Sequence, residues 1–375
     1  MNEPFPNLEQ KSSPSGGPPT SQHLWTGICP LPFQNATSIQ LAHGGGGRLM
    51  RELIRNLFVP IFSRREVAGL SDLVGKHDSA VLPLSGLRVA VTTDSYVVRP
   101  LFFPGGDIGR LAVFGTINDL AMAGAQPVAL SAAFILEEGF PLSELLRIVL
   151  SMEQAAEEAG VVIVTGDTKV VDRGKGDGVF ITTTGVGVVP AGVDIGPHRV
   201  RPGDAIMVSG DIGRHGVAIL SVREGLAFHT EIQSDCAPLE RAVRALISAG
   251  VEIHCLRDLT RGGLAAALNE IAADAGVGIE LEESAIPVSE PVLAACELLG
   301  LDPLYVACEG RLVCFVPPQA ADWARQILSS FPGGECAAQI GKCVRDHPGT
   351  VVARGPWGTE RVVDLLSGEQ MPRIC

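Results

Sequence analysis

The chain has 375 residues, of which 46% are apolar and 19% are charged, and it carries a net charge of −13. This length allows two domains with sizeable cores, and no apolar run reaches the roughly eighteen residues that a membrane-spanning helix needs. The negative charge excludes non-specific binding to nucleic acid or anionic lipid, and the first residues lack the basic-then-apolar pattern of a secretory signal.

The first part of the chain predicts an extension followed by an αβ domain. Residues 1–37 are rich in Pro, Ser, Gly, Asn and Gln, which is typical of disorder. From residue 38 to 195, strand and helix patterns interleave. Asp107 and Pro141 are suited to helix starts and Gly160 to a helix end. The expected elements are helices at 48–58, 109–125 and 141–160 and strands at 88–94, 127–136, 161–167 and 178–189.

A Pro/Gly-rich linker at 196–204 separates this domain from a second interleaved unit that ends near residue 365. We expect its helices at 214–222, 237–250, 262–276 and 289–300, its strands at 204–210, 277–281, 304–308 and 311–317, and a hairpin at 350–366 that turns between Gly355 and Gly358. The sequence therefore predicts an α+β protein of two domains. Residues 366–375 follow them as a mobile tail.

The nine cysteines indicate a reducing compartment, because their number is odd and no pair has zinc-ribbon spacing. We therefore expect a cytoplasmic protein. Cys375 is the last residue, and a thiol on a ten-residue tether reaches roughly 30–35 Å. Taken alone, this residue favours the alternative, a chance cysteine on a frayed terminus.

Acidic residues stand at strand ends and helix starts, where they converge easily on one edge of a sheet. Asp119 is the most unusual, because a charge on an otherwise apolar helix costs free energy unless a partner compensates it. Hard oxygen ligands of this kind suit Mg²⁺, which bridges to substrate phosphates. The alternative is that each carboxylate only caps a helix or a turn. The candidates are Asp78, Asp94, Asn118, Asp119, Asp167 and Asp258.

Glycine-rich loops precede several of the predicted helices, at 43–47, 104–107 and 209–216. Such turns present backbone N–H groups to phosphate, assisted by the helix dipole. None of them fits a P-loop or a Rossmann fingerprint. Lys169, which follows the acidic strand end at Asp167, is either a surface lysine or a cation that faces phosphate or a reacting group.

Taken together and in order, these motifs resemble the HypE family, the carbamoyl dehydratases of [NiFe]-hydrogenase maturation within the PurM-like ATP-binding superfamily. The resemblance covers residues 38–375 and rests on LAHGGGG, TTDSYVVRPLFFPGGDIGRLAVFGTINDLAMAGAQP, VTGDTKVV, SGDIGRHG, DLTRGGLAAALNEI and the terminal PRIC. It implies an N-terminal domain that pairs in a homodimer and a site for ATP and Mg²⁺ between the domains. It also implies two partners: a HypF-like carbamoyltransferase and a HypC–HypD-like iron scaffold.

The resemblance also implies roles for individual residues. Asp78, Asp94, Asp119 and Asp258 match metal or phosphate contacts, while His43, Gly45 and Gly46 match a loop that closes over the phosphates. Asn118, Asp167 and Thr168 complete the predicted nucleotide-binding set, and Asp211 and His215 match a glycine-rich loop of the second domain. Lys169 and Glu309 match an active-site pair near the acceptor, Cys375.

The implied reaction is the ATP-dependent dehydration of a carbamoyl group on Cys375 to a thiocyanate, the source of a cyano ligand for iron. Phosphorylation of the amide oxygen makes it a leaving group, and Glu309 is the expected base. One alternative is an ATP enzyme acting on a small substrate, such as a selenophosphate synthetase, a thiamine-monophosphate kinase or an aminoimidazole ribonucleotide synthetase. Another is a non-enzymatic, nucleotide-gated scaffold or metal chaperone that presents a terminal thiol.

Overall fold

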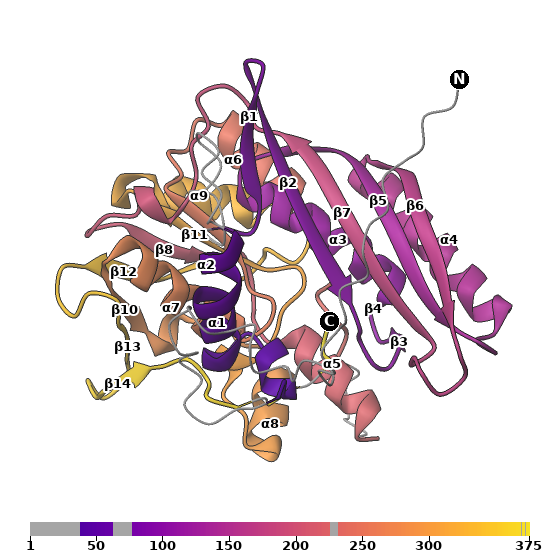
Figure 1. Ribbon diagram of the computed structural model, residues 1–375. Coiled ribbons are helices and arrows are strands. Elements are labelled where there is room, and N and C mark those ends of the chain that lie inside the picture. Colours follow the sequence, from indigo (N-terminus) through magenta and orange to yellow (C-terminus); the bar gives the residue numbers. More distant parts are fainter. Residues whose placement is uncertain (1–37, 63–76, 226–231, 369, 372) are drawn as a thin grey trace, which may run out of the picture. The chain divides into compact units, whose positions relative to one another are not determined.

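The computed structural model describes residues 38–62, 77–225, 232–368, 370–371 and 373–375. The extension predicted at 1–37 lies outside the described residues. Residues 39–375 belong to one unit, which contains two large β-sheets and a small one of β3 and β4 (Figure 1). Along the described part of the chain, no helix combines the length and apolar character that crossing a bilayer requires.

The first sheet is built from the N-terminal half of the chain and has five strands in the order β1-β2-β7-β5-β6. Only the β5–β6 pair is parallel. The elements of this half are η2 (Leu41–Gly44), α1 (Arg48–Leu53), a π-helical turn (Ile54–Phe58), α2 (Val59–Phe62), β1 (Ala80–Leu84), β2 (Leu87–Tyr96), β3 (Phe102–Phe103), β4 (Gly106–Asp107), α3 (Ile108–Met122), β5 (Gln126–Glu137), α4 (Leu142–Ala159), β6 (Val162–Val171) and β7 (Val179–Val188).

Helices α3 and α4 pack together and against this sheet, α3 on its central strands and α4 on β6. The α3 helix begins where expected, because the Asp107 carboxylate accepts hydrogen bonds from the N–H groups of Gly109 and Arg110. Apart from Arg110 and Asp119, every residue of α3 is buried, so this helix is a central part of the core. Gly160 ends α4 in the left-handed conformation, also as predicted.

The second sheet has seven strands in the order β14-β13-β10-β12-β8-β11-β9. Its elements are η5 (Pro197–Arg199), β8 (Ala205–Val208), α5 (Arg214–Arg223), α6 (Glu240–Ser248), β9 (Cys255–Asp258), α7 (Gly263–Ala275), β10 (Gly278–Glu282), η6 (Glu283–Ala285), α8 (Glu290–Leu299), η7 (Pro303–Tyr305), β11 (Leu312–Val316), η8 (Pro318–Ala320), α9 (Ala321–Leu328), β12 (Ala338–Val344), β13 (Val351–Arg354) and β14 (Glu360–Val363).

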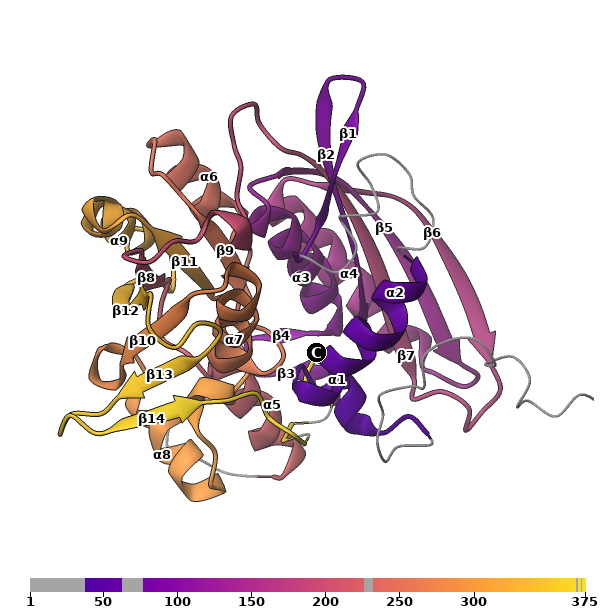
Figure 2. The ribbon, with the colours of Figure 1, turned by 60° about the vertical axis from the view of Figure 1, so that its left-hand side comes forward.

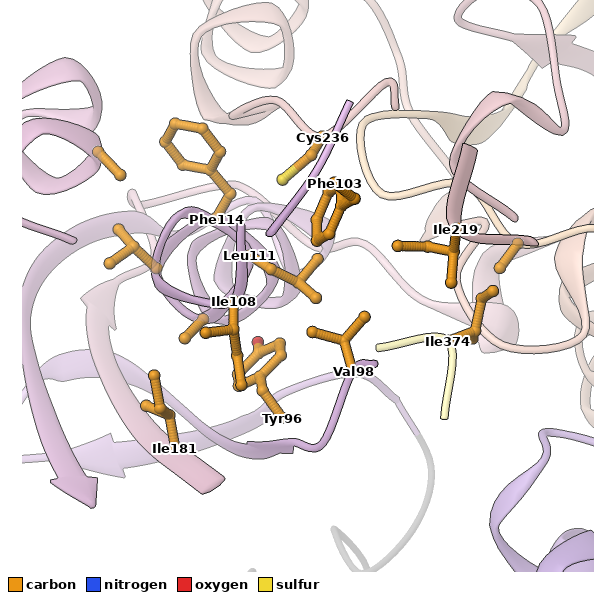
Figure 3. Close-up of a cluster of buried hydrophobic side chains, with 14 of the residues drawn as sticks. Tyr96, Val98, Phe103, Ile108, Leu111, Phe114, Ile181, Ile219, Cys236 and Ile374 are labelled. Atoms are coloured by element: carbon orange, nitrogen blue, oxygen red, sulfur yellow. The ribbon is translucent and has the colours of Figure 1, made fainter. Parts of the chain in front are cut away.

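The end of the chain is part of the core. Ile374 and Met371 are 4% and 7% exposed and belong to a buried cluster that includes residues of α3, α5 and α8. Figure 3 shows Ile374 beside Val98 and Ile219. Burying one isoleucine side chain contributes about 1.5–3 kcal/mol, so this contact favours a tail that lies against the two halves of the chain. In Figures 1 and 2 the C-terminus lies among elements of both halves.

The predicted α+β fold is confirmed, with one element wrong. The strand predicted at 304–308 is absent; the segment instead starts with the turn η7. The side chain of Asp302 caps this turn by accepting from Leu304 N–H, and Pro303 has no N–H to give to a sheet. The hairpin turning between Gly355 and Gly358 is confirmed as the β13–β14 pair.

Candidate active site

Three carboxylates from distant parts of the chain meet beside the end of α3. Asp78 precedes β1, Asp119 lies in the last turn of α3, and Asp258 ends β9. One oxygen of each lies within 4.8 Å of those of the other two. The chain therefore brings together three of the four aspartates predicted to bind metal.

Burial is the main cause of the high pKa of these groups. It raises the pKa of Asp78 and Asp119 well above the usual range, and neighbouring carboxylates raise the pKa of Asp119 further. It raises the pKa of Asp258 to about 6. Arg257 opposes this effect at Asp78, where its guanidinium lies 2.6 Å from a carboxylate oxygen.

The cluster fits a divalent cation. The second oxygen of Asp78 is buried and has no hydrogen-bond partner among the described residues. One oxygen of Asp119 accepts a hydrogen bond from the Thr92 hydroxyl at 2.7 Å. Clustered, partly unsatisfied carboxylate oxygens are the ligand set that Mg²⁺ prefers.

These carboxylates line a cavity of about 280 Å³. Asp94, the fourth predicted metal ligand, lies on its wall from β2 and accepts a 3.4 Å hydrogen bond from the Tyr96 hydroxyl. Arg257 and Arg261 also line the cavity, so its anionic character is partly balanced. Neither arginine was predicted, although both lie in or beside the DLTRGG motif that follows β9.

Cys375 lies in the wall of the same cavity. Its backbone carbonyl accepts a hydrogen bond from Val97 N–H at 3.1 Å. Burial raises the pKa of the thiol to about 12; Arg261 opposes the shift, and Glu309 adds to it. The thiol is therefore neutral at pH 7 in this position. The structure thus answers where the tail rests, which the sequence leaves open.

Glu309 is the second group of the predicted catalytic set that lines the cavity. The residue is 3% exposed, and one of its carboxylate oxygens has no partner among the described residues. Burial is the main cause that raises the pKa of Glu309 well above its ordinary value, and Asp258 and Asp235 add to it. A carboxylate with a raised pKa and a free oxygen is suited to proton transfer.

The first glycine loop contributes Gly46 and Gly47 to the cavity. Gly46 has φ +75°, and a Cβ there would lie 2.5 Å from the carbonyl oxygen of Arg261. Only glycine allows this close approach. Gly45 lines a smaller adjoining cavity, and His43 is buried at the start of the loop, where it hydrogen-bonds the backbone of Gln40.

Three of the predicted nucleotide-binding residues serve other contacts. Asn118 hydrogen-bonds the backbone of Ala237, Leu239 and Glu309, and so ties α3 to the second half of the chain. Asp211 is engaged by Arg311 at 2.9 Å and by Arg214 at 2.5 Å. His215 donates to or accepts from Ser234 and contacts the carbonyl oxygen of Ile374.

Lys169, the predicted catalytic lysine, and its neighbours on β6 lie apart from this cavity. Asp167, Thr168 and Lys169 are on β6, and the Lys169 ammonium pairs with Asp167 at 2.7 Å with both side chains exposed. None of the three lines the cavity that contains Cys375. Within one copy of the chain, the structure therefore does not bring Lys169 to Glu309.

Comparisons with known proteins agree with this architecture. The models of the AIR synthase related protein family match residues 76–189 with the N-terminal domain and residues 201–354 with the C-terminal domain. The carbamoyl dehydratase HypE of Azotobacter vinelandii is 56% identical over 338 residues, which cover 90% of this chain and 97% of that protein. The chain belongs to the carbamoyl dehydratase HypE family.

Solved structures of the family agree in fold. A structure described as hydrogenase maturation protein HypE in complex with ATP has 48% sequence identity and a TM-score of 0.75, covering 90% of this chain and 100% of that one. One described as a HypE–HypF complex has 45% identity and a TM-score of 0.77, with coverages of 83% and 99%. Membership of this family sets aside the small-substrate enzymes and the non-enzymatic scaffold considered from the sequence.

Proposed function

We propose that Cys375 carries a carbamoyl group and that the chain converts it to a thiocyanate with ATP. The family makes the chain an ATP-dependent carbamoyl dehydratase of hydrogenase maturation. The observation that supports Cys375 as the carrier is its position: the thiol of the final residue lines one cavity with Glu309 and the carboxylate cluster.

The reaction needs ATP because an amide oxygen is a poor leaving group. The carbamoyl oxygen attacks the γ-phosphorus of ATP and ADP leaves. The C–O bond then breaks, phosphate departs with that oxygen, and the nitrogen loses its two protons as the C≡N bond forms. The products are the S-cyano form of Cys375, ADP and phosphate.

Glu309 is the base in this proposal. It is buried, lines the cavity with Cys375 and retains an unpartnered carboxylate oxygen. The physical causes that raise its pKa also make its carboxylate a stronger base than an exposed one. Arg261 lines both cavities beside Cys375 and donates to the carbonyl of Gly44 at 3.2 Å. Its fixed charge would stabilise negative charge that develops on the transferring oxygens.

We assign Asp78, Asp119 and Asp258 as the residues that would hold Mg²⁺, and Asp94 as a nearby contributor. When bound, Mg²⁺ supplies charge neutralisation for phosphoryl transfer. The glycine loop at 43–47 would offer N–H groups to the phosphates.

We further propose that Lys169 acts across a homodimer. Described helices α3 and α4 cover one face of the five-stranded sheet. The other face carries the Thr93–Thr184 and Ser95–Thr182 hydroxyl pairs, and on β5 it carries Ala133, which pairs with Thr182, and Ile135, which is 44% exposed. Asp167 and Lys169 pair with Ala133 and Ile135 in the sheet register, and therefore belong to this open face. If a second copy of the chain packs on this face, Lys169 of each copy would contribute to the active site of the other.

The proposed partners follow the family. A solved HypE forms a complex with HypF, and we propose that a HypF-like carbamoyltransferase loads Cys375. A HypC–HypD-like complex would accept the cyano group. Because the reaction consumes ATP, we place the chain in the cytoplasm.

The direct test is intact-mass measurement after incubation with the carbamoyltransferase, carbamoyl phosphate and ATP. The chain should gain the mass of a cyano group, and fragmentation should place it on Cys375. Cys375→Ala should gain nothing while it still binds ATP. A cyano adduct on the alanine variant would refute the assignment, and Cys336→Ala, which removes an exposed cysteine, is the matched control.

A further inference from the structure

The last residues of the chain are held by their backbone. The N–H of Val97 donates to the carbonyl of Cys375 at 3.1 Å, and the N–H of Arg99 donates to the carbonyl of Arg373 at 3.2 Å. The two pairs run in opposite directions along the chain, as in an antiparallel ladder. Two backbone donors just beyond the end of β2 therefore set the register of the tail.

The backbone carbonyl of Ile374, which lies between those of Arg373 and Cys375, also accepts a hydrogen bond. Nε2 of His215 lies 2.8 Å from the oxygen of Ile374, and Nδ1 lies 2.8 Å from the hydroxyl of Ser234. The His215 side chain is fully buried, and its ring packs edge-on against Phe103. Burial lowers the pKa of His215, so the ring is neutral and its Nε2 donates to the carbonyl of Ile374 while its Nδ1 accepts from the hydroxyl of Ser234.

Arg373 makes the only ionic contact described between the tail's end and the rest of the chain. Its guanidinium pairs with Asp177 and donates to the carbonyl of Val97 at 2.9 Å. Asp177 also pairs with Arg99 at 2.5 Å. Arg223 donates to the carbonyl oxygens of both Arg99 and Arg373, at 2.6 and 2.9 Å, and so ties these two segments together.

We infer that Asp177, His215 and Arg223 are positioning residues that hold the terminal Arg373-Ile374-Cys375 segment and aim its thiol into the cavity. We call this set the tail dock. The inference rests on the proposed function, in which Cys375 is the carrier. Asp177 comes from the first half of the chain and the other two from α5 in the second half, so these three side chains hold the tail where the two halves meet.

The contacts of the tail dock are also compatible with a tail that must leave the cavity during the reaction cycle. The carrier has to reach a separate carbamoyltransferase for loading, and must return for dehydration. When Arg373 departs, Asp177 keeps its ion pair with Arg99, so the carboxylate is not left without a partner. The dock therefore stabilises the inward position of the tail without making departure prohibitive. Weakening it should slow dehydration and leave loading intact.

Alkylation of Cys375 in the full-length, ligand-free chain tests the dock without ATP or partner proteins. Arg373→Gln and Asp177→Asn should each raise the rate of Cys375 alkylation by iodoacetamide, about three- to tenfold, because each removes a charge-assisted contact. Arg373→Lys, which keeps the charge, should fall between wild type and Arg373→Gln. The double variant should exceed the stronger single variant by little, since both remove the same ion pair.

Internal controls are present in the chain itself. Cys336 is exposed and its alkylation rate should be equal in all variants, and buried Cys314 should stay protected if the fold is intact. Arg354→Gln, which removes an exposed arginine paired with Glu282 and Glu360, is the matched control and should leave Cys375 alkylation unchanged.

Two half-reactions then separate positioning from a general loss of stability. In Asp177→Asn, carbamoylation by the carbamoyltransferase should proceed at the wild-type rate or faster, while single-turnover dehydration should fall about three- to tenfold. Unchanged Cys375 alkylation in both Arg373→Gln and Asp177→Asn would overturn the dock. Faster alkylation with no thiocyanate from any chain, wild type included, would uphold the dock and overturn the proposed function instead.

Discussion

Asp119 is a carboxyl group on α3, where every other residue except Arg110 is buried, and placing it there costs free energy that a bound cation would offset. Three carboxylates within 4.8 Å repel one another without a cation. We predict that Asp119→Asn raises the Tm of the cation-free protein by about 1–3 °C, because it removes part of this repulsion. The same variant should lose most of the Tm increase that Mg²⁺ and ATP give to wild type. Differential scanning calorimetry measures both Tm values, with the protein in chelator and with Mg²⁺ and ATP added. If Mg²⁺ and ATP raise the Tm of Asp119→Asn as much as that of wild type, the metal assignment is contradicted.

The pH dependence of stability follows from Asp258. Its pKa is raised to about 6 in the folded chain, from an ordinary 3.8. A group whose pKa is raised on folding stabilises fully below its unfolded pKa, and this contribution is lost as pH rises through the folded value. The Tm of chelated protein should therefore fall between about pH 4 and pH 6, and less steeply in Asp258→Asn. Equal slopes in the two proteins would show that this carboxyl titrates as an exposed one does.

Replacing Glu309 tests its proposed role as the base. Glu309→Gln keeps the size of the side chain but removes the base, so single-turnover dehydration should slow by about 10²-fold or more. The carbamoylated chain should accumulate, as seen by intact mass. In wild type the rate should increase with pH as the carboxyl, whose pKa is well above its usual range, ionises. Normal conversion by Glu309→Gln would remove it from the mechanism.

At the scale of elements, the glycine loop offers a paired test. Gly46→Ala places a Cβ 2.5 Å from the carbonyl oxygen of Arg261 at a φ of +75°, whereas a Cβ at Gly44 meets nothing within 4 Å. We predict that Gly46→Ala weakens ATP binding about tenfold or more, because the loop must move away from Arg261. Gly44→Ala should bind ATP as wild type does. Isothermal titration calorimetry compares them, and equal affinities would exclude the loop from the nucleotide site.

The elements that sequence reasoning found are those with a strong local pattern. The start of α3 follows from Asp107 and the end of α4 from Gly160, and the β13–β14 hairpin follows from its glycines. The strand expected at 304–308 was wrong because Asp302 and Pro303 form a capped turn, and local side-chain hydrogen bonding prevailed over an apolar run.

The site was less predictable because its geometry depends on non-local pairing. The aspartates stood out by their positions at strand ends and helix starts, and Asp119 by its place on an apolar helix, and three of them do meet. Arg257 and Arg261 did not stand out, because an arginine beside an acidic motif looks like a surface residue until the fold places it in the wall of a cavity. The role of His215 depends on the tail's resting place, which no local pattern encodes.

At the scale of the whole molecule, the separation of Lys169 from Glu309 predicts an active dimer. Ile135→Arg, on the open face of the first sheet, should convert dimer to monomer in analytical ultracentrifugation and abolish dehydration. The matched control is Leu298→Arg in α8, which replaces a side chain that is 72% exposed and should remain dimeric. A monomeric wild-type chain with full activity would contradict this arrangement.

Complementation shows which copy supplies Lys169. Chains carrying Cys375→Ala and chains carrying Lys169→Ala should each be inactive alone. Mixed dimers should regain dehydration, because the intact Cys375 of one chain meets the intact Lys169 of the other. The thiocyanate should appear only on the Lys169→Ala chain. Absence of rescue in mixed dimers would place Lys169 outside the reaction or within its own copy.

The most direct measurement of the central claim follows the carbamoyl oxygen. The chain is carbamoylated at Cys375 with a heavy-oxygen label in the carbamoyl group, and ATP is added for one turnover. Because ATP activates that oxygen, the label should appear in inorganic phosphate as the thiocyanate forms. Label found in water, or retained on the protein after ATP is consumed, would contradict the account.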